Sequence, residues 1–313
     1  MQVIWNYDAA PRFHALLKAL AAEGIDVTAC PESDDARLFK LLPDAAVLWH
    51  CLRPVDATLL DAAPRLRLVQ KIGVGVNTID LALAESRGIA VCNMPGTNSR
   101  AVAEHALGLM LSVLRQLNRF DGDVRAGSGW NWDPQRQNDL GEISGRTVGL
   151  VGFGGVPRLL APTLEAMGAQ VIYTNRHPPA DDDRFRPLDQ LLAASDIVSL
   201  HVPLTAETEK LVNAERLSNM KRGAILVNTA RGGLVDETAL IDALADGRLS
   251  GAGLDVFAEE PTPTDHPLFA LPNVVLSPHV AWLTQETLQR SLTVAVENCR
   301  RLEAGEPLLH RVI

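Results

Sequence analysis

The sequence is poor in cysteine and in long uncharged stretches, and both shortages exclude classes of protein. Its four cysteines are far apart and lack CxxC spacing, so we predict reduced core thiols and no metal site (Cys30, Cys51, Cys92 and Cys299). The longest stretch without Asp, Glu, Lys or Arg, residues 266–285, carries three prolines, so we predict no membrane helix. Because Asp8 and Arg12 come before any long apolar segment, the N-terminus is unlike a secretory signal, and we predict a cytoplasmic protein.

Positive charge is also scarce. The chain has 29 Lys and Arg against 38 Asp and Glu, which gives a formal net charge of −9, and it has no basic run. Binding to a phosphate backbone needs positive charge, so we predict no nucleic-acid partner. Apolar residues make up 47% of the 313 residues, which is ordinary for a globular protein of two domains.

The chain alternates short apolar runs with helical patterns, in two series. In the first series the predicted strands are 2–5, 26–29, 45–49, 66–71 and 90–92, and the predicted helices are 11–22, 34–42, 56–63 and 79–87. In the second series the predicted strands are 147–151, 170–174, 196–200, 224–228, 251–256 and 273–277. Such alternation predicts an α/β protein whose parallel sheets carry helices on both faces.

Three other segments separate or follow these series. A predicted helix at 99–117 has a wide apolar face, which suits an interface between domains or subunits. Residues 121–142, which include Trp130 and Trp132, predict an irregular loop. A last helix at 285–303 brings no strand of its own, so we expect it to return and pack on the first series.

A glycine-rich turn, GFGGVP at 152–157, follows the predicted strand 147–151 and precedes a helical pattern. Gly152 permits the tight turn, Gly154 lets the backbone approach a pyrophosphate, and the helix N-terminus offers free N–H groups. Pro157 replaces the usual third glycine, but proline is tolerated in a first helical turn. The pattern predicts a dinucleotide-binding loop, and the alternative is a packing turn that binds nothing.

The choice of dinucleotide is expected to depend on the end of the next strand. A site specific for NAD usually has Asp or Glu there, whereas this chain has Asn175 and Arg176. Without a carboxylate to repel it, a 2′-phosphate could pair with Arg176, so we predict NADP(H) over NAD(H). The nearby acidic residues 181–183 weakly favour NAD(H). The alternative for Arg176 is a solvated surface cation.

Three predicted strands of the second series are each followed by an unusual polar residue. These residues are Arg231, Glu260 and His279. In an open parallel sheet, ligands bind outside the carboxyl ends of the strands. We therefore expect the three side chains on the same edge as the glycine-rich turn.

These residues lie in segments that resemble the signatures of the D-isomer-specific 2-hydroxyacid dehydrogenases. The segments are NTARGGLVDETAL (228–240), GAGLDVFAEEP (251–261) and SPHVAWLT (277–284), together with GVGVNTID (73–80), AVAEHALGLML (101–111) and HVPLTAET (201–208). The resemblance covers nearly the whole chain. It implies a Rossmann-type dinucleotide-binding domain, residues 98–283, inserted in a flavodoxin-like substrate domain of residues 1–97 and 284–313.

The resemblance also implies roles for single residues. Arg231 would bind the carboxylate and 2-oxo group of the substrate, and His279 would be the acid/base with Glu260 as its partner. Glu259 is the alternative partner, although the motif places the carboxylate directly before Pro261. Histidine exchanges protons near neutrality, a carboxylate on its second nitrogen favours imidazolium, and arginine offers paired donors. Asp255 would hold the nicotinamide carboxamide, and the other cofactor positions implied are Gly155, Val156, Val202, Pro203, Thr208, Thr229 and Ala230.

For the substrate, the resemblance implies backbone N–H groups at Val74 and Gly75, and an apolar wall of Leu52 and Trp282. Trp282 resembles the hydroxypyruvate and glyoxylate reductase branch and also the C-terminal-binding transcriptional corepressors; the alternative is a core or interface aromatic. Related formate dehydrogenases have glutamine where Glu260 stands, so formate is disfavoured. We predict reduction of small 2-oxo acids such as glyoxylate, hydroxypyruvate or phenylpyruvate to D-2-hydroxy acids. The alternative function is a nucleotide-sensing binding protein on the same scaffold.

The resemblance finally implies a homodimer built through the dinucleotide-binding domains. The helix 99–117 and the loop with Trp130 and Trp132 would supply the contacts, since an exposed apolar helix face is costly.

Overall fold

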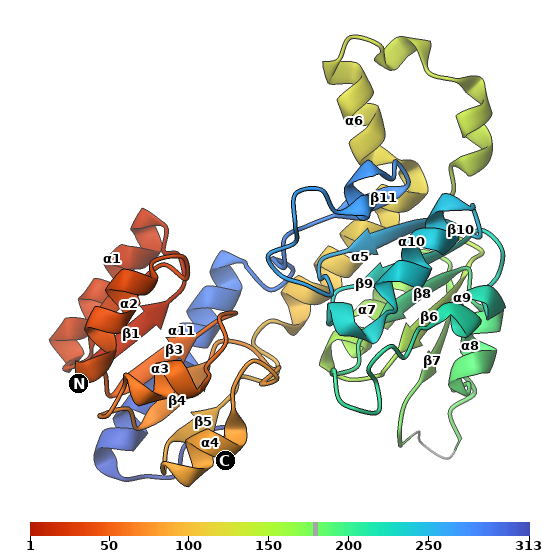
Figure 1. The fold of residues 1–313 in the computed structure, drawn as a ribbon. Coiled ribbons are helices and arrows are strands. Elements are labelled where there is room, and N and C mark those ends of the chain that lie inside the picture. Colours follow the sequence, from red (N-terminus) through yellow and green to blue (C-terminus); the bar gives the residue numbers. More distant parts are fainter. Residues whose placement is uncertain (178–180) are drawn as a thin grey trace. The chain divides into compact units, whose positions relative to one another are not determined.

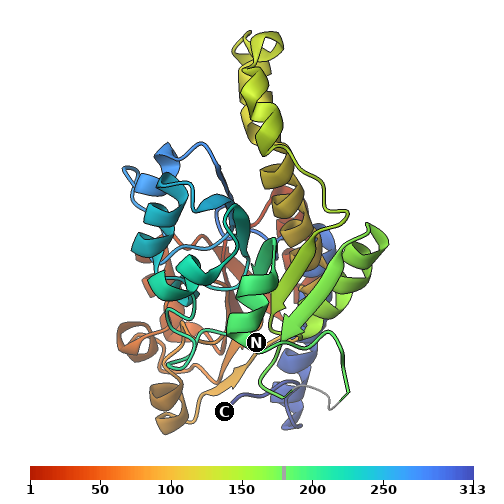
Figure 2. The same ribbon diagram turned by 90° about the vertical axis from the view of Figure 1, so that its right-hand side faces the viewer.

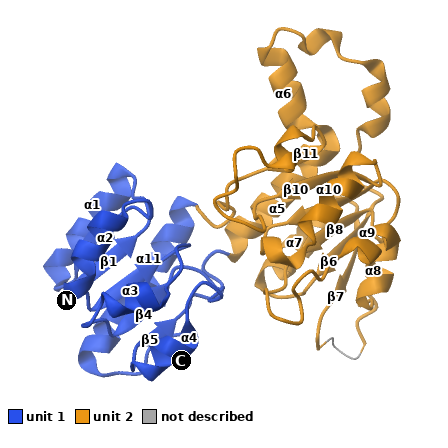
Figure 3. Cartoon of the chain, viewed as in Figure 1, with its two compact units in different colours: residues 1–98, 284–313 blue, residues 99–283 orange. Residues whose placement is uncertain are grey.

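The computed structural model describes residues 1–177 and 181–313. The chain divides into two compact units, and the second interrupts the first (Figure 3). Unit 1 comprises Met1–Asn98 and Thr284–Ile313, and unit 2 comprises Ser99–Leu283. Each unit is described by itself below.

Unit 1 is built on a parallel sheet of five strands in the order β2-β1-β3-β4-β5 (Figure 1). This order is the flavodoxin-like one, which confirms the fold predicted for this part of the chain. The strands are β1 (Gln2–Asn6), β2 (Asp26–Cys30), β3 (Val47–His50), β4 (Leu68–Lys71) and β5 (Ala90–Cys92). The helices are α1 (Pro11–Ala19), α2 (Asp35–Leu41), α3 (Ala57–Asp61), α4 (Leu81–Ser86) and α11 (Gln285–Ala304).

Side-chain caps set where several of these helices begin. Asp34, Asp56 and Asp80 accept hydrogen bonds from the first turns of α2, α3 and α4, which satisfies N–H groups that have no partner within the helix. The C-terminal helix α11 is held in unit 1 by Asn298, whose Nδ2 donates to Gln70 Oε1 at 2.6 Å. The four cysteines are buried and unbridged, as predicted from their spacing.

Unit 2 contains a six-stranded parallel sheet in the order β11-β10-β9-β8-β6-β7. The chain order reverses between β6 and β8, as in Rossmann-type dinucleotide folds, so the predicted fold class is confirmed here too. The strands are β6 (Thr147–Val151), β7 (Gln170–Thr174), β8 (Ile197–Leu200), β9 (Ala224–Asn228), β10 (Leu249–Leu254) and β11 (Val274–Leu276). The helices are α5 (Ser99–Arg115), α6 (Leu117–Arg125), α7 (Gly155–Ala166), α8 (Leu188–Ala194), α9 (Ala214–Asn219) and α10 (Glu237–Ala245).

Two hydrophobic cores cover the two faces of this sheet. Helices α5 and α7 pack on one face, and α8, α9 and α10 pack on the other. Helix α5 approaches β10 closely because two glycines face it. A Cβ on Gly251 would lie 2.6 Å from Val113, and a Cβ on Gly253 would lie 2.8 Å from Leu109. The apolar face of α5 is therefore accounted for by packing within unit 2.

The irregular loop predicted at 121–142 is wrong in its first part, because helix α6 continues to Arg125. Gln116, with a positive φ of 49°, separates α5 from α6. None of the α6 side chains is buried, but Leu117, Phe120 and Val124 have the i, i+3, i+7 spacing of one helical face, a signal that the loop prediction did not use. The helix and the segment after it project from the rest of unit 2 (Figures 1 and 2), and Trp130 is 92% exposed.

In the described part of the chain, no helix combines the length and the apolar character needed to span a bilayer.

Candidate active site

The glycine-rich turn lies at the carboxyl end of β6, where the strand order of unit 2 reverses. Gly152 has a φ of 98°, and a Cβ on it would lie 2.7 Å from the carbonyl oxygen of His201. Both the backbone conformation and the close approach therefore require glycine. Ligands bind in the crevice at such a reversal point, so the turn occupies the expected place for a dinucleotide.

The residues after Gly152 leave room for a phosphate group. Gly154 is the N-cap of α7, and a Cβ on it would meet nothing within 4 Å among the described residues. Gly155 and Val156 form the first turn of α7, whose N–H groups have no partner within the helix. Thr229, which follows β9, carries a buried hydroxyl without a hydrogen-bond partner among the described residues. An open glycine, free helix N–H groups and an unsatisfied hydroxyl at one sheet edge fit a dinucleotide.

The loop after β8 packs beside the glycine-rich turn. The γ-methyl of Val202 would lie 3.0 Å from a Cβ on Gly152. Thr208 closes this loop, because its hydroxyl donates to the carbonyl of Pro203 at 2.7 Å and accepts from the Thr205 N–H at 2.8 Å. The structure thus brings three predicted cofactor residues, Val202, Pro203 and Thr208, to the same sheet edge.

The end of β7 carries Asn175 and the exposed Arg176, and the Asn175 side chain accepts from the Arg176 N–H at 2.9 Å. The side chain and backbone N–H of Arg184, and then the Tyr173 hydroxyl, donate hydrogen bonds to Asp182 and lower its pKa to about 2. Glu207, which the sequence did not single out, lies near Arg176. A hydrogen bond from Thr205, then its own backbone and the charge of Arg176, lower the pKa of Glu207.

Arg231 stands three residues after β9, in a turn closed by Asn228. The Asn228 side chain donates to the Arg231 carbonyl at 2.8 Å and accepts from the Ala230 N–H at 3.0 Å. Arg231 Nη1 donates to the carbonyl of Ala230 at 2.6 Å. Burial lowers the pKa of the guanidinium, and the charge of Glu260 opposes that effect.

The next residue, Gly232, brings this turn against the segment after β10. A Cβ there would lie 1.9 Å from the carbonyl carbon of Phe257, so only glycine fits. The Phe257 N–H in turn donates to Glu260 Oε1 at 2.9 Å. Arg231 and Glu260, 29 positions apart in the sequence, are thereby held close enough for their charges to interact.

The other oxygen of Glu260 pairs with the predicted acid/base. His279 Nδ1 lies 2.6 Å from Glu260 Oε2, and the structure therefore joins His279 to Glu260. Burial raises the pKa of Glu260, but its bonds to His279 and Phe257, with the charge of Arg231, outweigh burial and lower the pKa. An ionised carboxylate on Nδ1 leaves Nε2 as the nitrogen that can exchange a proton with a ligand.

Asp255, directly after β10, is a buried carboxylate that binds the turn carrying His279. Its Oδ1 accepts from the Ser277 hydroxyl at 2.6 Å and the Val280 N–H at 2.9 Å, and its Oδ2 accepts from the Ala281 N–H at 2.8 Å. Its own carbonyl accepts from the His279 N–H at 2.7 Å. The predicted contact of Asp255 with a nicotinamide carboxamide stays a prediction, and it would use the remaining acceptor capacity of Oδ2.

Trp282 is buried, and its indole N–H donates to the carbonyl of His279 at 3.1 Å. It therefore braces the same turn. The predicted apolar wall of Leu52 and Trp282 stays a prediction. Within unit 1, Leu52 follows β3 and its N–H donates to Glu32 Oε1 at 2.6 Å. Val74 and Gly75 follow β4 in the same unit, so they too lie at the carboxyl ends of parallel strands.

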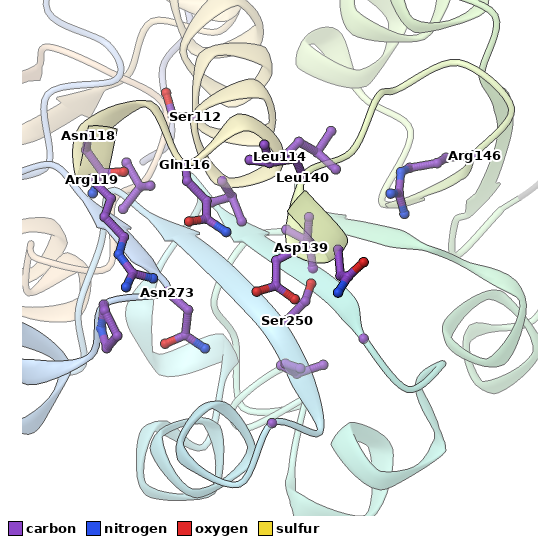
Figure 4. Close-up of a pocket in the computed structure, with 18 of the residues that line it drawn as sticks. Ser112, Leu114, Gln116, Asn118, Arg119, Asp139, Leu140, Arg146, Ser250 and Asn273 are labelled. Atoms are coloured by element: carbon purple, nitrogen blue, oxygen red, sulfur yellow. The ribbon is translucent and has the colours of Figure 1, made fainter. Parts of the chain in front are cut away.

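A cavity of about 510 Å³ lies at the opposite, amino edge of the sheet of unit 2 (Figure 4). It is lined by the end of α5, by residues 138–140 and by residues around the starts of β9, β10 and β11. Its polar lining includes Gln116, Arg119, Asp139, Arg146, Ser250 and Asn273. No predicted site residue lines this cavity, so it is separate from the candidate active site.

Sequence reasoning missed three polar side chains near the predicted site, namely His105, Glu207 and Ser277. Ser277 and His105 lie in the quoted motifs, and Ser277 comes two positions before His279, but only the fold places His105 of α5 2.8 Å from the Ser277 hydroxyl. Glu207 also lies in a quoted motif, HVPLTAET (201–208), but only the fold places it near Arg176.

Comparison with known proteins agrees with this geometry. The family model described as "D-isomer specific 2-hydroxyacid dehydrogenase, NAD binding domain" matches residues 107–281. The glyoxylate reductase of Thermofilum pendens is 40% identical over 284 residues, covering 88% of this chain and 83% of that protein. The D-3-phosphoglycerate dehydrogenase of Mycobacterium leprae is 41% identical over 92% of this chain, which spans only 55% of that longer protein.

Among solved structures, similarity extends over the whole fold. The NADPH-dependent glyoxylate/hydroxypyruvate reductase of Sinorhizobium meliloti, in complex with NADP and malonate, is 32% identical with a TM-score of 0.83. The match covers 99% of this chain and 96% of that chain. The protein therefore belongs to the D-isomer-specific 2-hydroxyacid dehydrogenase family.

Proposed function

We propose that this protein reduces small 2-oxo acids of the glyoxylate and hydroxypyruvate type to D-2-hydroxy acids, using NAD(P)H. The observation that carries the proposal is the His279–Glu260 pair at 2.6 Å, held beside Arg231 on the sheet edge of the glycine-rich turn. Family membership supports it, as do relatives named glyoxylate reductase. In this proposal unit 2 is the dinucleotide-binding domain and unit 1 is the substrate domain.

The reaction needs a hydride on C2 of the 2-oxo acid and a proton on the carbonyl oxygen. The nicotinamide, when bound, supplies the hydride. His279 donates the proton from Nε2, because Nδ1 is engaged by Glu260. Glu260, ionised because its pKa is lowered, stabilises the imidazolium that donates.

Arg231 has two roles in this mechanism. Its planar guanidinium binds the substrate carboxylate with paired donors and polarises the 2-oxo group, which accepts negative charge as the hydride arrives. The resemblance also implies that the N–H groups of Val74 and Gly75 bind the substrate carboxylate and that Leu52 and Trp282 contact its apolar part. The cofactor would be held by Gly152, Gly154, Val156, Thr208, Thr229 and Asp255, as the resemblance implies.

A spectrophotometric screen of 2-oxo acids against NADPH and NADH tests the proposed function. We expect turnover with glyoxylate or hydroxypyruvate. The competing function, a nucleotide-sensing protein with little turnover, would give cofactor binding in a titration but no substrate-dependent oxidation across the panel. That result would reject the reductase.

We further propose that NADP(H) is preferred over NAD(H). Arg176 is exposed at the end of β7, where the 2′-phosphate of the adenosine would lie. Among the acidic residues 181–183, which favour NAD(H), Asp182 is already bonded to Tyr173 and Arg184. Glu207 near Arg176 works against the preference, because a carboxylate repels a phosphate.

Replacing Arg176 by alanine is expected to lower kcat/KM for NADPH about tenfold and to leave kcat/KM for NADH nearly unchanged, because one charge-assisted contact to phosphate is lost. The matched variant Glu207→Gln removes the opposing charge and should raise the ratio of NADPH to NADH efficiency. Steady-state kinetics with both cofactors provides the measurement. A wild-type enzyme tenfold more efficient with NADH would end the proposal.

We also propose a homodimer built through unit 2. Helix α5 does not support this dimer, because its apolar face packs within its own unit. Four exposed apolar side chains lie close together in the sequence after α5, at Leu117, Val124, Trp130 and Trp132. Light scattering at micromolar concentration should give twice the monomer mass, and Trp130→Ser should lower that mass. A monomeric wild-type protein would contradict the proposal.

A further inference from the structure

The packing of α5 on β10 follows a regular register that extends one step beyond its apolar part. Val113 faces Gly251 and Leu109 faces Gly253. Four helical residues rise about 6 Å and two strand residues advance about 6.6 Å, so the two elements stay in step. One further step along each element leads from Leu109 to His105 and from Gly253 to Asp255. The two glycines therefore bring an imidazole of α5 to the buried carboxylate after β10.

Hydrogen bonds connect His105 and Asp255, the two residues to which this register leads. His105 Nε2 lies 2.8 Å from Ser277 Oγ, and the Ser277 hydroxyl donates to Asp255 Oδ1 at 2.6 Å. His105 Nε2 is itself 3.6 Å from Asp255 Oδ1. Because the single proton of the serine hydroxyl goes to the carboxylate, His105 must be the donor to Ser277 Oγ. The order of donation is therefore His105 to Ser277 to Asp255.

Asp255 connects His105 and Ser277 to the proposed acid/base, His279. It binds the N–H groups of Val280 and Ala281 through its side chain and that of His279 through its carbonyl. His279 has a φ of 54°, a left-handed conformation that is unfavourable for a residue with a Cβ. Such a conformation persists only where surrounding contacts enforce it. The Asp255 contacts are among those that do so here.

We propose that His105 is a positioning residue for the reaction, which acts through Ser277 and Asp255 to hold the turn that aims His279. The proposal rests on the proposed function, since it refines the geometry of that acid/base. His105 itself touches neither substrate nor cofactor in it. Its imidazole fixes the rotamer of the Ser277 hydroxyl and, through it, the Asp255 carboxylate.

Two substitutions at position 105 separate positioning from packing. His105→Phe keeps a ring of similar volume and removes the donor, whereas His105→Gln keeps an amide donor and loses the ring. We expect kcat to fall about tenfold in His105→Phe, with KM for the 2-oxo acid within about twofold of wild type, because small displacements of a reacting group are costly. His105→Gln should recover most of kcat. Glu104→Gln, an exposed neighbour on α5, is the matched control.

Ser277→Ala tests the middle of the network. If the two residues act as one unit, Ser277→Ala should lower kcat as much as His105→Phe, and the double variant should be no worse than either single variant. Additive losses would mean that His105 acts by another route and would overturn the proposal. So would a His105→Phe enzyme with wild-type kcat, or a His105→Gln enzyme as impaired as the phenylalanine variant.

A measurement without substrate keeps this test independent of the proposed function. The proton on His279 Nδ1, in its 2.6 Å bond to Glu260, should give a downfield imidazole resonance in the proton NMR spectrum of the whole protein. We expect the resonance to persist in His105→Gln and Glu104→Gln and to be broadened or lost in His105→Phe. If no 2-oxo acid is turned over but the resonance follows this pattern, the proposed function fails and the positioning role stands. An unchanged resonance in His105→Phe would overturn the positioning role.

Discussion

Replacing His279 by alanine is expected to lower kcat for 2-oxo acid reduction about 10³-fold while leaving cofactor binding intact. A positioned acid/base contributes about 10²–10⁴-fold to proton-transfer reactions, and His279 is the proposed donor. Its side chain bonds Glu260, so its removal takes away the proton donor without disturbing the glycine-rich turn. The measurement is kcat under saturating substrate, together with a fluorescence titration of NADPH.

A second histidine offers a matched control. His310 also has a positive φ, 52°, but it is exposed and belongs to unit 1. His310→Ala changes the side chain at a similarly strained backbone position and should leave kcat within about twofold of wild type. A His279→Ala enzyme that keeps more than about a third of the wild-type kcat would refute the acid/base role.

Arg231→Ala should lower kcat/KM for the 2-oxo acid about 10²- to 10³-fold, through both a higher KM and a lower kcat. Truncating a charged hydrogen-bond partner of a bound carboxylate costs about 2–5 kcal/mol, and about 1.4 kcal/mol corresponds to a factor of ten. Arg231→Lys should restore only part of the loss, because a lysine ammonium is a point charge and cannot form two parallel bonds.

The control for Arg231 lies at the other end of the same strand. Arg222 precedes β9, is exposed, and stands at the amino edge of the sheet, so Arg222→Ala should leave kcat/KM unchanged. Equal losses in the Arg222 and Arg231 variants would indicate a general effect of positive charge. Full activity in Arg231→Lys would argue against paired recognition of a carboxylate.

The strands and the polar residues that follow them could be predicted from the sequence. The runs at 147–151, 170–174 and 224–228 are bounded by turn residues, and the structure places β6, β7 and β9 there. Parallel strands bring their carboxyl ends to one edge, so Arg231, Glu260 and His279 could be assigned to that edge without coordinates. The pairing of His279 with Glu260 was implied by the family resemblance, and from the residues alone Glu259 was an alternative partner.

Contacts between segments far apart in the chain could not be predicted. The bond between His105 and Ser277 joins residues 172 positions apart and depends on how closely α5 approaches β10. That approach is set by Gly251 and Gly253, whose significance appears only when the facing side chains are known. Helix α6 was missed for another reason: Gly127, Gly129 and Pro134, which follow it, favoured a loop, and the helical spacing of Leu117, Phe120 and Val124 was not used.

The division of the chain into two units has a consequence for how new specificities can arise. The proposed acid/base His279, its partner Glu260 and Arg231 all lie in unit 2, whereas Leu52, Val74 and Gly75, which are proposed to contact the substrate, lie in unit 1. The 2.6 Å bond of His279 to Glu260, and the bonds of Asp255 and Trp282 to the turn of His279, join residues of unit 2. Selection for a different acid could thus act on the two outer segments of the gene, which encode unit 1, while the central segment that encodes the proposed proton donor is inherited unchanged.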